Sequence, residues 1–504
     1  MSVYVPSRFV RVIDDLIGVI APKSALERHI ARQRLHLFRY EAASSSRERR
    51  TSSASLGSPE SSGYQRDRVQ LGKDGRDLAE NGDLAAGILG KFENHVIGSL
   101  RYQARTGDDT YDGEIEEYFG DWSRICDLTG RHSFHQLAQL GLREVLAIGD
   151  EGTVVVRDGG RLLLAGIEAD RIGNPHESRA EENYVGGILL DELKRPKAYR
   201  VYNRTVTGAY ENPVEIPAHS FIHVFKPRRY DEYRGISAFH PVINTVRDIK
   251  EIVEFEKLAV KWASCQTGVV SSDAKGPDVA DYYESGTYPN SGTAQRIEEI
   301  TPGRVNYIPE NGRFEQFKID RPGAAWQGFL QLLIRLYAAG LNLDYGFVFD
   351  MSGLTGPAAR FVSEQAKRTF QGWQRLLEDK KLNRIKNLVI ANGIANGDLK
   401  AKPNWMRGVW QFPAHPTIDI GRESAANLNE NRQGIKSMDT ILGPEGLDGG
   451  EEREKIAQEA ADWLRLSKKH NVPVEMMRLL TPNGNELQTD KQGGATRETA
   501  TETG

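Results

Sequence analysis

Residues 241–264 read PVINTVRDIKEIVEFEKLAVKWAS, a stretch with one apolar face and one charged face. The apolar face recurs at helical spacing: Val242, Val246, Ile249, Val253, Val260 and Ala263. On the charged face, Arg247 and Glu251 are of opposite sign four residues apart, as are Lys250 and Glu254. The spacing predicts one continuous helix, about 36 Å long at 1.5 Å per residue.

A second helix is predicted over residues 324–339 and a third over 357–392, in which Gly372 marks an expected kink. The polar segment 265–320 separates the first two helices, and the irregular stretch 341–356 separates the last two. Two long helices that flank a compact polar segment suit a rod-like stem with a cap at its end. Copies of such a rod can pack side by side and close into a ring. The same pattern also fits two core helices of an ordinary α+β domain.

The regions on either side mix helical and strand patterns. Further helices are expected at 3–39 (as one or two), 83–97, 111–129, 132–148, 422–441 and 451–470. Residues 150–225 are β-rich, because Thr153–Arg157 and Arg161–Ala165 flank Asp158-Gly159-Gly160, a strong hairpin signal. The Ser-rich stretch 42–63 cannot bury enough apolar area to offset its ordering entropy and predicts a mobile linker.

Composition excludes several classes of protein. The 504 residues are 39% hydrophobic, and 66 Lys and Arg stand against 70 Asp and Glu, which argues against a polybasic nucleic-acid binder. The two cysteines, Cys126 and Cys265, cannot form a disulfide framework and fit a reducing compartment. No apolar run approaches the length of a membrane span, and Asp14 and Asp15 lie where a secretory signal would be apolar.

The sequence offers little that predicts catalysis. It contains no P-loop, dinucleotide-binding, nucleophile-elbow or zinc-protease motif. Cys126, His132 and His135 lack a fourth metal ligand, and His219 with His223 fits a surface pair. The acidic residues Glu114, Glu116 and Glu117 fit a solvated helix face better than a metal site. We therefore predict no catalytic residue, no metal site and no cofactor.

Several stretches, in their order and spacing, resemble the portal proteins of tailed bacteriophages of the lambda type. They are GGILLDELKRPKAYRVYN at 186–203, HVFKPRRYDEYRGISAFHP at 223–241, residues 299–345, DMSGLTGPAAR at 350–360, and 419–448 with GIKS at 434–437. The family usually has N-Y-S-S-A-R after its aspartate, whereas this chain has LTGPAAR at 354–360.

The resemblance implies an α+β, mostly helical portal-type fold, with a β-rich wing, long stem helices, a small mixed clip and a helical crown. By position, the expected parts are an N-terminal helical arm at 1–40, a Ser-rich linker at 41–75, a wing at 76–240, a stem helix at 241–264, a clip at 265–320, a second stem helix at 321–340, a channel loop at 341–356, a long helix and wing return at 357–415, a crown at 416–480 and a disordered tail at 481–504.

The resemblance also implies a function and partners. Portal proteins form a ring, commonly of twelve subunits, at a single capsid vertex, where DNA is packaged and later ejected. The expected partners are further copies of the chain, the major capsid protein or scaffold, the terminase large subunit, a head–tail connector or adaptor, and double-stranded DNA that passes non-specifically. No membrane partner is expected. The expected location is the virion, after assembly in the host cytoplasm.

A conduit for DNA should not grip its cargo, because each cation paired with a phosphate adds affinity. Charges on the first stem helix balance, with the candidate residues Arg247, Lys250, Glu251, Glu254, Lys257 and Lys261 among them and Asp248 and Glu256 completing the set. The candidate channel-loop residues are Asp344, Asp350, Met351, Leu354 and Thr355, and no basic residue lies between 341 and 356. The two aspartates would repel DNA in a ring. Alternatively, they cap turns.

The clip is expected to carry a hairpin between 305–309 and 314–319, together with a short helix at 278–285. Its candidate partner-docking residues are tyrosines, which are common anchors at protein interfaces: Tyr282, Tyr283, Tyr288 and Tyr307. Alternatively, these rings form a small local core under the hairpin.

Two other functions compete with that of a portal. One is a phage-associated nuclease or protease with a carboxylate site, which would be a monomer with metal-dependent activity. The other is a ring-forming DNA clamp, which should have a basic inner face, and the sequence does not obviously supply one.

Overall fold

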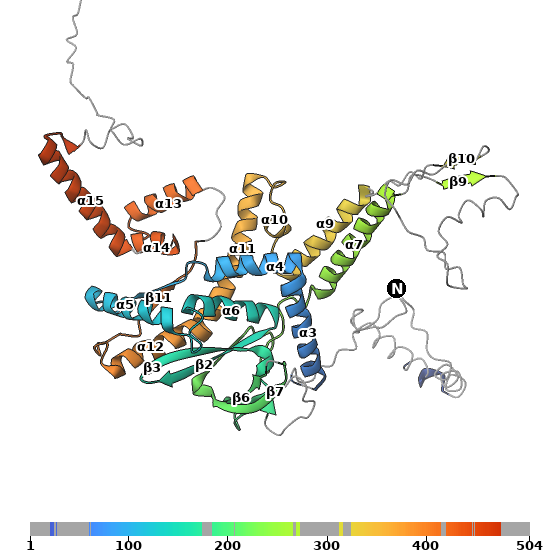
Figure 1. The fold of residues 1–504 in the computed structure, drawn as a ribbon, viewed down its shortest axis with the longest axis horizontal. Coiled ribbons are helices and arrows are strands. Elements are labelled where there is room, and N and C mark those ends of the chain that lie inside the picture. The colour runs from blue at the N-terminus through green and yellow to red at the C-terminus, as the bar shows by residue number, and fades with distance from the viewer. Residues whose placement is uncertain are drawn as a thin grey trace, which may run out of the picture. The chain divides into compact units, whose positions relative to one another are not determined.

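The computed structural model separates the chain into two units, Met1–Ser61 and Ser62–Gly504. The second unit contains nearly all of the described helices and strands (Figure 1). The structure describes residues 21–24, 27, 60, 62–173, 184–205, 207–265, 269–272, 312–315, 324–414, 420–445, 447 and 449–474.

Four helical segments open the second unit: α3 (Ser62–Asn81), α4 (Asp83–Phe92) with its π-helical extension (Glu93–Ile97), α5 (Asp109–Ile125) and α6 (Phe134–Ala147). Ser133 begins α6 through a capping box, in which its side chain accepts from the Gln136 amide and the Gln136 side chain accepts from the Ser133 amide. The buried faces of α4, α5 and α6 join one large hydrophobic core, as their amphipathic patterns require.

The start of α3 differs from the expected linker at 41–75, because helix occupies 62–75. The sequence signal is weak, since Gly72 and Gly75 interrupt the helical pattern. In the structure these glycines lie against the end of α6, where a Cβ on Gly75 would clash with the carbonyl oxygen of Ala147. Close packing against α6 therefore compensates for their low helix propensity.

Two antiparallel sheets follow. The first has the order β3-β2-β8, from β2 (Asp150–Asp158), β3 (Arg161–Glu168) and β8 (Phe221–Phe225). The second has the order β4-β5-β6-β7, from β4 (Tyr184–Val185), β5 (Ile188–Leu190), β6 (Pro196–Arg204) and β7 (Tyr210–Pro217). The expected hairpin at 158–160 is present, with Gly159 and Gly160 at φ of 54° and 80°. A second core of apolar side chains joins the two sheets: Ile167, Ile172, Ile188, Tyr199, Val201 and Phe221 among them.

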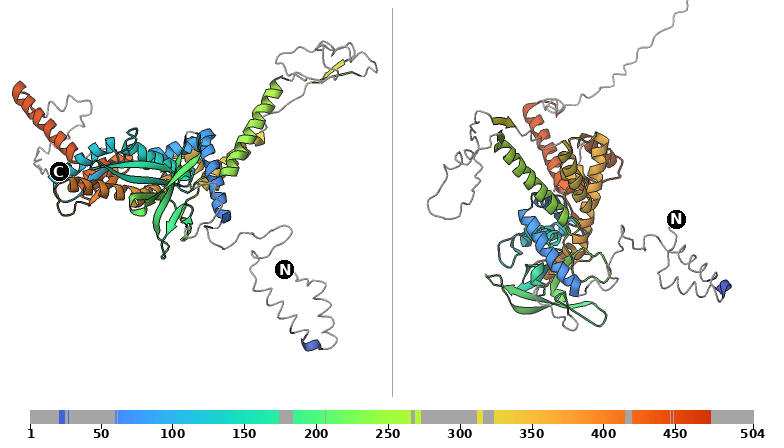
Figure 2. Two further views of the ribbon diagram at one scale, coloured as in Figure 1. Left: turned by 60° about the horizontal axis from the view of Figure 1, so that its bottom comes forward. Right: turned by 90° about the vertical axis from the view of Figure 1, so that its right-hand side faces the viewer.

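The first two long helices are α7 (Ile243–Cys265) and α9 (Ala324–Gly340), which lie side by side in Figure 1. Figure 2 shows α7 from two further sides. The two helices contact each other and run antiparallel, so that Val242 lies against Gly340 at one end of the pair. At the other end, β9 (Val269–Ser272) pairs with β10 (Gly312–Glu315). The strand that begins at Phe314 in the expected hairpin therefore pairs with 269–272, while its expected partner 305–309 lies outside the described residues.

The third long helix consists of α11 (Gly356–Leu377), a π-helical segment (Glu378–Leu382) and α12 (Asn383–Asn396). The irregularity expected at Gly372 lies instead at 378–382. Lys381 in this segment is buried and pairs with the equally buried Glu151, with 2.7 Å between Nζ and Oε1. The ion pair gives the π-helical segment a fixed attachment to β2.

The C-terminal part contains β11 (Gly408–Gln411), which pairs with β1 (Arg101–Ala104), and then α13 (Ile420–Arg432), α14 (Met438–Leu442) and α15 (Gly449–His470). The prediction of a single helix at 422–441 is wrong. Gly434 has φ of 73°, a left-handed conformation that ends α13, and Ser437 then caps α14 by accepting from the Thr440 amide.

Candidate channel elements

The candidate stem residues lie on α7, where the apolar face packs on α9 and most of the charges point outward. Five of them are exposed: Lys250, Glu251, Glu254, Lys257 and Lys261. Arg247 is also exposed, but its guanidinium lies 2.8 Å from Asp74 of α3 and does not pair with Glu251. Since Glu256 is buried, the exposed charges of α7 are four cations against three anions, and Asp74 supplies the fourth anion. The exposed surface of α7, together with Asp74, is therefore close to neutral.

The candidate channel loop contains a short helix, α10 (Tyr345–Val348). Asp344 caps this helix, because its Oδ1 accepts from the Gly346 amide at 2.7 Å. Asp350 makes a similar turn, with 2.8 Å from its Oδ1 to the Ser352 amide. Hydrogen bonds from Ser352 hold the pKa of the exposed Asp350 carboxyl below its usual value. Both aspartates therefore do cap turns, and both carry a role in local structure beside any effect of their charge.

The remaining candidate loop residues face different ways. Met351 and Leu354 are half-buried and pack against the large core, whereas Thr355 is exposed at the start of α11. Phe349, which the sequence did not single out, is 57% exposed. The exposed part of the loop is therefore Phe349, Asp350, Ser352 and Gly353, followed by Thr355.

Two cations from other elements reach the loop, although the loop has none of its own. Lys91 of α4 donates from Nζ to the carbonyl oxygens of Phe347 at 2.6 Å and Val348 at 2.9 Å. The Arg335 guanidinium of α9 lies 5.4 Å from the ring centroid of Tyr345. Burial lowers the pKa of Lys91. The contact of Lys91 could not be predicted from local sequence spacing, because Lys91 is 256 residues from Phe347 in the chain.

The candidate clip residues Tyr282, Tyr283, Tyr288 and Tyr307 lie outside the described residues. Their expected contact with a partner, or with one another, stays a prediction.

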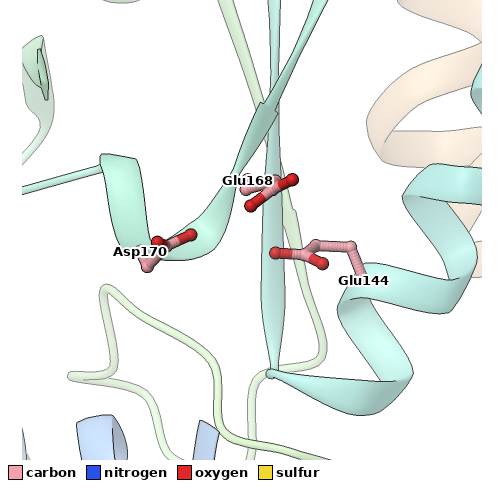
Figure 3. A group of neighbouring side chains, drawn as sticks. All are labelled: Glu144, Glu168 and Asp170. Carbon is pink, nitrogen blue, oxygen red and sulfur yellow. The ribbon is translucent and has the colours of Figure 1, made fainter. Parts of the chain in front are cut away.

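Figure 3 shows the one group of carboxylates, within the described part of the chain, whose oxygens come close enough to hold a metal ion: Glu144, Glu168 and Asp170. Two guanidinium groups already pair with these carboxylates. Arg76 lies 3.2–3.4 Å from all three carboxylates, and Arg204 pairs with Glu168 and Asp170. The cluster is therefore explained as an ion-pair network that joins α3 and α6 to β3 of the first sheet and β6 of the second.

The other groups considered for metal binding are accounted for individually. Cys126 is buried, and burial raises the pKa of its thiol to about 12. The expectation that His223 forms a surface pair with His219 is wrong, because the His223 side chain is buried and its Nε2 lies 3.1 Å from the buried Asp150. Glu116 accepts from the Ala104 amide. Neither His132 nor His135 joins Cys126 in a ligand cluster among the described residues.

Comparison with known protein families identifies the family to which this chain belongs. The family described as phage portal proteins of the lambda family matches residues 45–374, which include the sheets β3-β2-β8 and β4-β5-β6-β7, the helices α7 and α9, and the segment 341–356. The chain belongs to the lambda family of phage portal proteins. This confirms the resemblance seen in the sequence and favours a portal over a carboxylate-site nuclease or protease. Portal proteins of this family are structural rather than catalytic.

The portal chain is also similar to solved structures. One is described as the neck of a native GTA particle computed with C12 symmetry, with 13% identity, a TM-score of 0.43, and coverage of 74% of this chain and 90% of that one. Another is the neck of an empty GTA particle computed with C6 symmetry, at 12% identity and a TM-score of 0.42, covering 73% and 93%. No curated protein matches the chain. Within the described residues, no helix is both long and apolar enough to cross a membrane.

Proposed function

We propose that copies of this portal protein stand side by side in a closed ring of about twelve subunits, with α7 and α9 as the stem around a bore that admits double-stranded DNA. The observation that carries the proposal is a row of exposed apolar side chains along α9. Phe329, Leu332 and Leu336 are each 50–54% exposed, and their spacing of three and four residues places them on one face.

The occupant that suits this row is a second copy of the chain. The paired helix α7 also exposes apolar side chains, Phe255 at 62% and Leu258 at 53%. Full burial of a side chain of this size stabilises an assembly by about 1.5–3 kcal/mol. In a closed ring every subunit uses both of its flanks, so no apolar flank is left in water.

The charges of the stem suit the passage of DNA better than its capture. A surface that neutralised many phosphates would hold DNA tightly and with strong salt dependence. The exposed charges of α7, together with Asp74, are balanced, and the exposed loop contributes Asp350. This balance favours a conduit over a clamp with a basic inner face.

The place and partners of the ring follow from its family. We propose that the ring occupies one capsid vertex of the virion after assembly in the host cytoplasm, in contact with the major capsid protein or scaffold. The segment 265–320, as the clip, would receive the terminase large subunit during packaging and the head–tail connector afterwards. We assign the ring no catalytic step and no cofactor, and its DNA contacts would be independent of base sequence.

The proposal is tested by changing the apolar row on α9. Leu332→Asp should leave purified protein as small species in light scattering, whereas wild type forms rings. The matched control is Leu193→Asp, which alters an even more exposed leucine, at 72%, in a turn away from α9. Rings that persist in Leu332→Asp and in the double variant Leu332→Asp/Leu336→Asp would overturn the proposed interface.

A further inference from the structure

The helix α10 cannot be stable through its own hydrogen bonds. It has four residues, Tyr345–Val348, whereas isolated helices shorter than about 12 residues are marginal in water. Asp344 satisfies one amide at its start. The carbonyl groups at its end have no partner within the helix and need one from outside.

Lys91 supplies that partner. Its ammonium donates to the carbonyl oxygens of both Phe347 and Val348, and it lies 5.2 Å from the ring centroid of Phe347. A cation at the carboxyl end of a helix is favoured by the charge of the free carbonyls. The ammonium is itself partly withdrawn from water, which strengthens these charge-assisted hydrogen bonds.

Aromatic packing against α11 also stabilises the position of Phe347. The Phe347 ring lies 5.8 Å from the ring of His95, which follows Lys91 by one helical turn, and 5.6 Å from Phe370 of α11. His95 stacks on Phe370 with 5.0 Å between centroids. The start of the loop is fixed to the same helix α11, because Thr369 Oγ1 donates to the Asn342 carbonyl at 2.8 Å.

Beyond Val348 the contacts with Lys91, His95 and Phe370 stop, and what remains is the half-buried Met351 on the core and the Phe349 ring 5.8 Å from that of Tyr345. From Phe349 to Gly353, four of the five residues are exposed, and Asp350 bonds only within the turn, to Ser352. The loop 341–356 therefore has a fixed base, 342–348, and an exposed tip, 349–353.

We propose that Lys91 is a positioning residue that clasps the base of the channel loop, so that movement against DNA is confined to the tip at 349–353. The part about DNA rests on the proposed function, whereas the clasp itself does not. Without Lys91, the hydrogen bonds of α10 should open. The segment that can move would then extend from the tip back to Asn342, and the position of the tip would be less well defined.

Hydrogen exchange on the purified full-length protein tests the clasp. The amides of Phe347, Val348 and Phe349 donate to Asp344 and Tyr345 oxygens, so their exchange reports the opening of α10. Lys91→Met keeps the alkyl chain and removes the donors, and it should speed this exchange by about tenfold or more. Lys91→Arg should restore part of the protection. If Lys91→Met folds poorly, Lys91→Gln, which keeps a polar end, serves in its place and should also speed this exchange.

The matched control is Lys226→Met. Lys226 is also partly buried beside an aromatic ring of α11, 4.6 Å from the centroid of Trp373, but has no hydrogen bond to the loop. This variant should leave exchange at 347–349 unchanged. Unchanged exchange in both Lys91→Met and Lys91→Gln, or an equal increase in Lys226→Met, would overturn the clasp.

Measurement of packaged DNA distinguishes the contact made by Lys91 from its proposed effect on DNA. Particles assembled with Lys91→Met should retain less DNA than those with Lys226→Met. If exchange rises in Lys91→Met but DNA retention is unchanged, the clasp stands and the role of the loop in holding DNA is wrong.

Discussion

Arg234 and Asp150 form an ion pair in which the side chains are 0% and 1% exposed. Arg234 also donates to the carbonyl oxygens of Ala169, Ile172 and Gly186. Asp150 belongs to β2 of the first sheet, whereas Gly186 lies in the turn before β5 of the second. One guanidinium therefore joins the two sheets, and the oxygens that accept from it would be left buried without a donor in its absence.

Arg234→Met should destabilise the fold by about 3–5 kcal/mol, because it leaves the buried Asp150 carboxylate without its cationic partner. Chemical denaturation of the purified protein measures this change. Arg195→Met is the control: Arg195 pairs with Asp191 at the surface and should be near neutral. Equal effects of the two substitutions would contradict the assigned role of Arg234.

The acidic network should make stability depend on pH. Burial raises the pKa of Glu144 to about 7, although the Arg76 guanidinium opposes the shift. A carboxyl whose folded pKa lies above its unfolded value stabilises the fold at low pH, and this contribution is lost as pH rises from about 4.5 to about 7. Glu144→Gln, which remains neutral, should flatten the stability curve in this window, whereas Glu192→Gln at the surface should not.

Asp150 should behave in the opposite sense. Burial alone would raise the pKa of its carboxyl, but Arg234 and the His223 hydrogen bond hold that pKa well below the usual range. Its contribution is therefore constant above the unfolded pKa near 4 and is lost only in stronger acid. A gain in stability as pH falls from 7 to about 4 that disappears in Asp150→Asn would show that the pKa is raised and that this sign is wrong.

Two glycines in neighbouring helices should respond oppositely to alanine. Gly75→Ala places a Cβ against the Ala147 carbonyl and should destabilise the fold by about 2 kcal/mol or more. Gly87→Ala in α4 meets no atom within 4 Å and should stabilise by up to about 1 kcal/mol through helix propensity. Thermal unfolding of both variants checks the α3–α6 contact, and a harmless Gly75→Ala would contradict it.

A double substitution can separate the charge of Asp344 and Asp350 from their capping hydrogen bonds in the candidate channel loop. The double variant Asp344→Asn/Asp350→Asn keeps side-chain oxygens that can accept from Gly346 and Ser352, and it removes only the charge. If the aspartates keep DNA mobile by repulsion, particles of this variant should package shorter DNA. Packaged length equal to that of wild type would leave capping as the only role of the two residues.

Sequence alone anticipated the elements whose signals are local. The hairpin at Gly159-Gly160 was predictable because both glycines adopt positive φ, and α7 and α9 were predictable from their apolar stripes. The resemblance of separate motifs then indicated the family, which the match over residues 45–374 confirms.

Features that depend on distant partners could not be predicted in this way. The π-helical segment at 378–382 has no local signal and is fixed by the Lys381–Glu151 pair, 230 residues apart. The pairing of β10 with β9 joins strands about 40 residues apart in the chain, a separation for which no local turn gives a signal. The clasp of Lys91 on Phe347 and the burial of Met351 and Leu354 likewise depend on how α4 and α11 pack beside the loop.

The apolar side chains of α7 and α9 are expected to contact neighbouring copies in a closed ring, each flank of one copy against the opposite flank of the next. The proposed function depends on this contact. Native mass measurement of the purified full-length protein tests it most directly. We expect one dominant closed species with a mass close to twelve times 56.3 kDa. A single-copy species that persists across protein concentrations and under assembly conditions would contradict the account.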